Sequence, residues 1–218
     1  AGIGTDGTSF QFAVSENNWL GKGVKLKTAL NLSTEQISGN IMINNPNYNF
    51  SDKSLKAGVD VSSTDRSSSS GFKSSKTGFV LGTGFEQYED LFFTPEINVA
   101  FEEIEVDASA STAIKNMEGD FFNIDFTYGL TLDKRDQSWK PTEGYKTTFV
   151  QSLPIVQDSS AIMNSLAVST YHDFSDDVIG SLKFHVQAIN GLDKDVRLTK
   201  RLFMSRNSLR GFNVRRVG

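Results

Sequence analysis

Apolar and polar side chains alternate along most of this sequence, and this period of two constrains its fold more than any other feature. Successive side chains of a β-strand point to opposite faces of a sheet, so such a run predicts a strand with one apolar and one polar face. The clearest run has Phe122, Ile124, Phe126, Tyr128, Leu130 and Leu132 on one face and Asn123, Asp125 and Thr127 on the other. The sequence is therefore predicted to be all-β.

About ten such runs follow one another, and a shorter one precedes them. They are predicted as strands at residues 8–16, 23–33, 36–45, 53–63, 74–86, 91–106, 120–134, 144–153, 161–174 and 177–189, with the short strand at 1–5. Turn-forming pairs such as Asp6-Gly7 and Glu89-Asp90 separate the runs. Because short turns join consecutive strands, neighbouring strands are predicted to be antiparallel. Two polar stretches, Ser62–Ser75 and Asp107–Gly119, are predicted to be mobile loops.

No apolar run approaches the roughly 20 residues that a membrane-spanning helix needs. Any membrane crossing would therefore use strands, whose alternation keeps the mean hydropathy near that of soluble proteins, here −0.30. Alternation alone fits both a soluble β-sandwich, with its apolar face against a second sheet, and a membrane barrel, with that face against lipid. Aromatic residues near predicted strand ends, such as Trp19, Trp139 and Tyr145, favour the barrel because such rings gather at membrane interfaces. Aromatic residues flank turns in soluble sheets too, so both architectures stay open at this point.

The residue types that carry most enzyme chemistry are scarce. The sequence has no cysteine, which excludes disulfides, thiolate metal sites and cysteine nucleophiles. Its two histidines, His172 and His185, fall on different predicted strands without further ligands, so no metal site is predicted. Gly2–Gly7 matches the phosphate-binding pattern G-x-G-x-x-G, but no helical period follows it. We predict no catalytic, cofactor or metal site and no enzymatic activity.

An acidic run, Glu102, Glu103, Glu105 and Asp107, ends one predicted strand. It lacks the spacing and the glycine of a calcium-binding loop, and Glu102 and Glu103 fall on opposite faces of the strand. We expect a solvated strand end that leads into a loop.

Charge and composition favour a single domain and argue against nucleic acid as a partner. The net charge is −4, and lysines and arginines are dispersed until Arg215-Arg216. Nucleic acid is therefore not an expected partner. No linker-like change of composition divides residues 1–218, which are predicted to form a single domain.

Four segments, in this order along the chain, carry a resemblance to a known family. They are Asn17–Gly23, Asn45–Tyr48, Arg135-Asp136 with Pro141–Tyr145, and Leu209-Arg210-Gly211-Phe212. The first two are similar to periplasmic turns of the BamA family of outer-membrane assembly factors. The third resembles that family's hairpin before a strand, and the fourth resembles its inward-folded loop. The resemblance covers essentially the whole chain.

The resemblance implies an antiparallel transmembrane β-barrel of sixteen strands in the bacterial outer membrane, preceded by periplasmic POTRA domains. Residues 1–218 would then be a partial barrel of about ten to eleven strands, without the POTRA domains and the last strands. The implied function is to fold and insert other outer-membrane proteins without ATP or covalent chemistry. The implied partners are the lipid bilayer, unfolded outer-membrane proteins and Bam accessory lipoproteins. Related branches with the same loop motif are TamA-like translocation factors and two-partner secretion transporters, which export a protein through the pore.

The resemblance also implies two functional segments. Leu209, Arg210, Gly211 and Phe212 would lie in the loop that enters the barrel lumen, where Arg210 would bind carboxylates of late strands. Ala1, Gly2, Ile3, Gly4 and Thr5 would be the tail of the first strand, beside a weakly closed seam between first and last strands. An incoming strand could pair with an edge at such a seam.

Overall fold

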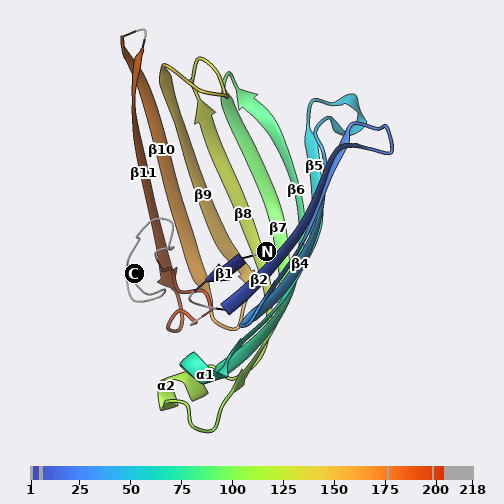
Figure 1. The fold of residues 1–218 in the computed structure, drawn as a ribbon, viewed down its shortest axis with the longest axis vertical. Helices are drawn as coiled ribbons and strands as arrows, with labels where there is room; N and C mark the ends of the chain where they lie inside the picture. Colours follow the sequence, from blue (N-terminus) through green and yellow to red (C-terminus); the bar gives the residue numbers. More distant parts are fainter. Residues whose placement is uncertain (1, 5–6, 176, 198, 204–218) are drawn as a thin grey trace.

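A computed structural model describes residues 2–4, 7–175, 177–197 and 199–203, and it contains one antiparallel sheet of 11 strands in sequence order. The strands are β1 (Gly2–Gly4), β2 (Gly7–Trp19), β3 (Val24–Ser33), β4 (Gln36–Asn45), β5 (Ser54–Arg66), β6 (Phe72–Tyr88), β7 (Leu91–Val106), β8 (Gly119–Asp133), β9 (Gly144–Val156), β10 (Ala161–Ser175) and β11 (Val178–Gly191). Each strand pairs with its neighbour in the chain, as the short turns predicted. Figure 1 shows the sheet curled around an open concave side, with β1 and β11 at its edges.

Each predicted strand is present, with differences at the ends, but the loop predicted at Ser62–Ser75 is wrong. β5 continues to Arg66 and β6 begins at Phe72, so only a helical turn, α1 (Ser67–Ser70), connects them. The register continues through the serine-rich stretch because small hydroxyl side chains fit a paired strand, and an ion pair of 3.1 Å joins Lys73 to Asp65 across the two strands. The other predicted loop connects β7 to β8 and contains one helical turn, α2 (Thr112–Lys115).

One face of the sheet is apolar and has no second layer over it. The register places Ile41, Val59, Phe79, Val99 and Ile124 in one row across β4 to β8. Large apolar side chains on this face are exposed: 64% for Phe12, 59% for Leu81 and 55% for Phe184. A sandwich would bury these side chains against a second sheet. Their exposure on so wide a surface is what a barrel wall in contact with lipid requires.

The opposite face is polar, and its side chains bond to one another across strands. Lys56 of β5 forms an ion pair with Glu96 of β7, and Gly82 of the intervening β6 leaves the space because a side chain there would lie 2.8 Å from Glu96. Thr127 of β8 accepts a hydrogen bond from Asn98 at 3.2 Å and donates one to Ser152 at 2.9 Å. Polar contacts of this kind suit a wet lumen.

The connections of the sheet divide between its two ends. In Figure 1, α1 and α2 lie at the lower end, and β11 also finishes toward this end. The tight β2–β3, β6–β7 and β10–β11 connections lie at the other end, as antiparallel order requires. Within the described residues, no helix is long and apolar enough to cross a membrane.

Candidate functional site on the polar face

After β11 the chain turns back toward the sheet. We call residues 192–197 and 199–203 the returning segment. Its first part is fixed to the β9–β10 connection: the N–H of Leu192 donates to the carbonyl of Ser160 at 2.8 Å, and the N–H of Ser160 donates to the Asp193 carboxylate at 2.8 Å. The Ser159 hydroxyl donates to the carbonyl of Asp195 at 3.3 Å. These bonds aim the following residues across the polar face.

Arg197 is the centre of this contact and is 4% exposed. Its Nη1 lies 3.5 Å from Oε2 of Glu102 in β7, and its Nη2 donates to Oδ1 of Asn123 in β8. The guanidinium also lies over the ring of Phe121, with 4.2 Å between its Cζ and the ring centroid. Glu102, Phe121 and Asn123 all lie on the polar face. A buried arginine thus meets a carboxylate, an amide oxygen and an aromatic ring, the three groups that best compensate its desolvation.

Lys200 adds a second cation to the same region. Burial lowers the pKa of Lys200 and attraction to Asp125 opposes this shift, while the nearby Arg197 lowers the pKa further. Asp125 in turn accepts a hydrogen bond from Gln157 of the β9–β10 connection. The wall contributes the carboxylates of Glu102 and Asp125, and the returning segment contributes the cations Arg197 and Lys200. Attraction between these opposite charges holds the segment against the wall. We call Glu102, Phe121, Asn123, Asp125, Arg197 and Lys200 the Arg197 cluster.

The cluster and its neighbours Thr199 and Gln157 include buried polar atoms that have no hydrogen-bond partner among the described residues. They are Nε of Arg197, Oγ1 of Thr199 and Oε1 of Gln157. A buried donor or acceptor left unpaired costs about 1–3 kcal/mol. Burial also lowers the pKa of Arg197, with attraction to Glu102 as the main opposing effect. Arginine stays charged even so, and Glu102 therefore contributes strongly to holding the segment.

The sequence-based interpretation of Glu102 is wrong. The Glu102 side chain is only 9% exposed and is paired with Arg197, whereas a solvated strand end was expected. The prediction that Glu102 and Glu103 face opposite sides is confirmed, because the register places Glu102 with Phe121 and Glu103 with Asp120. Sequence reasoning also missed Arg197, whose local sequence carries no motif.

The residues assigned by resemblance do not belong to the Arg197 cluster. Leu209, Arg210, Gly211 and Phe212 lie outside the described residues, as do Ala1 and Thr5. Gly2, Ile3 and Gly4 form β1, which pairs with β2 from Gly7 to Ser9. β1 is an edge of the described sheet.

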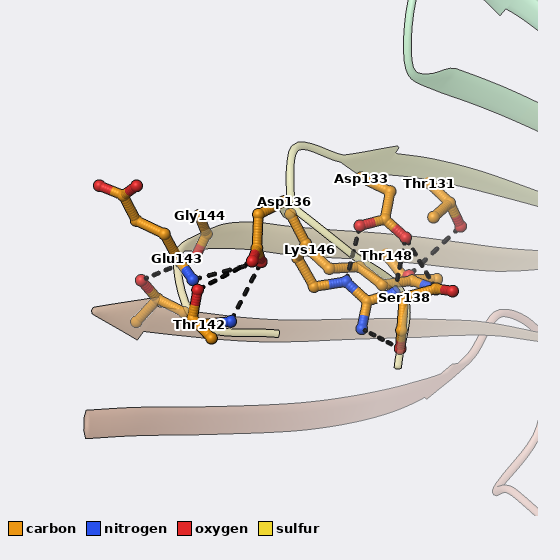
Figure 2. A network of polar contacts seen from close by, with 11 residues as sticks. Thr131, Asp133, Asp136, Ser138, Thr142, Glu143, Gly144, Lys146 and Thr148 are labelled. Atoms are coloured by element: carbon orange, nitrogen blue, oxygen red, sulfur yellow. Dashed lines mark hydrogen bonds and ion pairs between the residues drawn. The ribbon is translucent and has the colours of Figure 1, made fainter. Parts of the chain in front are cut away.

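The β8–β9 turn, which contains the third resembling segment, is held by two carboxylates (Figure 2). Asp136 accepts hydrogen bonds from the Thr142 hydroxyl at 2.8 Å and from the backbone N–H groups of Thr142 and Glu143 at 3.1 and 3.3 Å. Asp133 binds both Nε and Nη2 of Arg135, at 2.7 and 2.8 Å. This bidentate bond raises the pKa of Arg135. The third resembling segment is therefore a turn that hydrogen bonds of its own side chains hold closed.

The histidines occupy β10 and β11, as predicted, and His185 bonds to the Ser165 hydroxyl at 3.1 Å. His172 lies with Glu143 and Asp173 so that one ligand atom from each falls within 4.8 Å of the others. All three side chains are exposed, and nothing else in the described part of the chain points to a bound ion there. Exposed acidic groups are common without a bound ion, and no proposal is built on this one.

The sheet is a curled antiparallel meander. Its outer face exposes large apolar side chains, as a surface in contact with lipid does, and its polar inner face binds a segment of the same chain. These features define part of the wall of an outer-membrane β-barrel. The sequence profile of the Omp85 superfamily domain matches residues 18–218, and the chain belongs to this superfamily. Superfamily members are assembly and transport factors of the outer membrane, and the chain is accordingly a bacterial outer-membrane protein.

A solved structure of similar fold is that of BamA from Haemophilus ducreyi lacking POTRA domains 1–3. The TM-score is 0.70 at 16% sequence identity, and the match covers 86% of this chain and 39% of that one. At this identity the likeness concerns the fold. The chain forms a BamA-like partial barrel and spans about two fifths of the length of that BamA chain.

Proposed function

We propose that this chain is part of an outer-membrane assembly factor that folds and inserts β-barrel proteins, as in the BamA family. The observation that carries the proposal is the Omp85 match over residues 18–218, together with a chain that folds back onto the polar face after β11. In this proposal residues 1–218 form a single part of a larger barrel that follows POTRA domains. Its partners are lipid, unfolded outer-membrane proteins and Bam accessory lipoproteins.

The proposed mechanism uses strand pairing and no covalent chemistry. An edge strand presents unpaired N–H and C=O groups, to which a substrate strand adds by main-chain hydrogen bonds. The segment from Ala1 to Thr5 would lie at such an edge in the complete barrel. Inside a lumen, Arg210 would bind carboxylates of later strands through its guanidinium fork. No catalytic group takes part, and the protein would not be an enzyme.

The test uses the complete protein in lipid vesicles and follows insertion of a radiolabelled substrate barrel. Arg210→Ala is expected to lower the inserted yield, and Arg210→Lys to restore it only in part because an ammonium cannot reproduce the guanidinium fork. Arg206→Ala is the matched control outside the motif. Wild-type yield from Arg210→Ala would remove this residue from the mechanism.

The same vesicles separate the other branches of the superfamily. A TamA-like factor or a two-partner secretion transporter would move a soluble passenger protein through the pore. The passenger is enclosed in the vesicles, where added protease does not reach it. If export occurs, the protected amount of passenger decreases with time, whereas insertion leaves the substrate barrel in the bilayer. Export without insertion would contradict the assembly function and favour a transporter.

A further inference from the structure

The Arg197 cluster joins parts of the chain that are far apart in sequence. Arg197 follows β11, whereas Glu102 lies 95 residues earlier in β7 and Asn123 lies 74 residues earlier in β8. The side chain of Arg197 is therefore inserted against the middle of the sheet and does not extend from its edge. β7 and β8 are paired neighbours in the sheet, and Arg197 contacts them from the concave side.

The contact is selective for a guanidinium. One edge of Arg197 donates to Glu102 and Asn123, and its plane lies 4.2 Å from the ring centroid of Phe121. A lysine ammonium could neither donate to two acceptors from a fixed plane nor stack on the ring in this way. At 5% exposure of the Arg197 side chain and 9% of Glu102, water does not replace either partner. Removing one partner would leave a buried charge unpaired.

We propose that Arg197 is a positioning residue that holds the returning segment against the β7–β8 wall of the lumen. The inference deepens the proposed function and rests on it, because the same chain continues to Leu209–Phe212. Six residues after Phe203 reach at most about 20 Å. Holding residues up to Phe203 on the wall thus confines the start of that motif to one region of the lumen. The loop would have this anchor in addition to Arg210.

The experiment changes residues of β7 and β8 that contact Arg197. Every lysine and arginine of the returning segment then stays in place, so the trypsin sites in this segment are the same in all variants. Glu102→Gln removes the charge and keeps the shape, and Phe121→Leu removes the ring. Glu103→Gln is the matched control: Glu103 is the next residue on β7 but faces the other side, where it accepts a hydrogen bond from Ser75 at 3.4 Å. Each variant is made in the complete protein and reconstituted in vesicles.

Trypsin added to these vesicles reports whether the segment is held. Cleavage at Lys194, Arg197, Lys200 and Arg201 is expected to be at least about tenfold faster in Glu102→Gln than in the wild type, since a lost buried partner strongly favours the released state. Phe121→Leu should also accelerate it, and Glu103→Gln should not. Heat-dependent mobility in gel electrophoresis confirms that each barrel is folded.

Equal cleavage rates for Glu102→Gln, Phe121→Leu and Glu103→Gln would overturn the anchor. Substrate insertion is measured on the same vesicles to separate the two proposals. Faster cleavage with unchanged insertion would support the anchor and contradict the role of the loop in assembly. Unchanged cleavage together with lost insertion in Arg210→Ala would leave the assembly function standing without this anchor.

Discussion

Nη1 of Arg197 lies 3.5 Å from Oε2 of Glu102, although 95 residues separate the two in the sequence. This contact makes the polar face of the sheet a binding surface for the protein's own chain. The ends of the contact belong to β7 and to the segment after β11, so it forms only when the sheet curls. Docking of the segment therefore depends on both the curvature of the sheet and the polarity of its inner face.

Phe126 is predicted to face lipid, whereas its neighbours Asp125 and Thr127 face the lumen. The register places Phe126 in a row with Ile97 and Leu153, all on the apolar face. Phe126→Arg should destabilise the barrel by roughly 2–4 kcal/mol if it lies near the bilayer midplane. Urea unfolding in vesicles measures the difference.

Cysteine labelling checks the same facing without a stability measurement. A lipid-soluble probe should react with cysteine at position 126, and a water-soluble probe with cysteine at position 125. The opposite pattern would mean that the two faces are assigned the wrong way round.

Strands could be predicted from the sequence because alternation is a local property. The run from Phe122 to Leu132 needs no knowledge of the rest of the chain, and its facing agrees with the register of β8. Composition misled the prediction at Ser62–Ser75, where paired serines continue two strands. Arg197 and Glu102 could not be matched in advance because their contact depends on the curl of the whole sheet, which no local pattern encodes.

The isolated 218-residue chain is predicted to associate through its edges. β11 pairs with β10 alone, so one side of its 14-residue backbone has no strand partner in the described sheet. Such an edge promotes pairing with another copy. Sedimentation in mild detergent should detect dimers or larger species whose amount increases with protein concentration. A monomer over the whole concentration range would show that the edge is protected in another way.

The β8–β9 turn is predicted to weaken in acid. Partial desolvation would raise the pKa of Asp136, but hydrogen bonds from Thr142 and Glu143 more than offset it, so the pKa lies below the ordinary 3.8. A lowered pKa means that the ionised carboxylate stabilises the fold at pH above 3.8, and that this contribution is lost as the pH falls through the folded-state pKa. The protection factors of the Thr142 and Glu143 amides, which correct for the intrinsic pH dependence of exchange, should fall below pH 3.8. In Asp136→Asn this pH dependence should be absent, and its persistence would assign the effect to another group.

Gly144, the one glycine between Lys134 and Tyr145, is predicted to be hard to replace. Its φ is +92°, and an added Cβ would lie 2.1 Å from the carbonyl oxygen of Lys134. That backbone is fixed, because the N–H of Lys134 donates to the carbonyl of Tyr145 at 2.8 Å. The loss of stability in Gly144→Ala should therefore exceed the about 1–2 kcal/mol that a left-handed backbone alone costs alanine.

Gly21→Ala separates the clash at Gly144 from the backbone strain. Gly21 has a φ of +70° in the β2–β3 turn, but an added Cβ would meet no atom within 4 Å. Its substitution should show only the strain, measured for both variants as the free energy of unfolding in urea. If both variants lose the same stability, the β8–β9 turn relaxes around the new methyl group and the close approach at Lys134 does not limit position 144. A larger loss at Gly144 means that glycine is required there by the packing of two backbone segments, which explains why the turn has this residue before Tyr145.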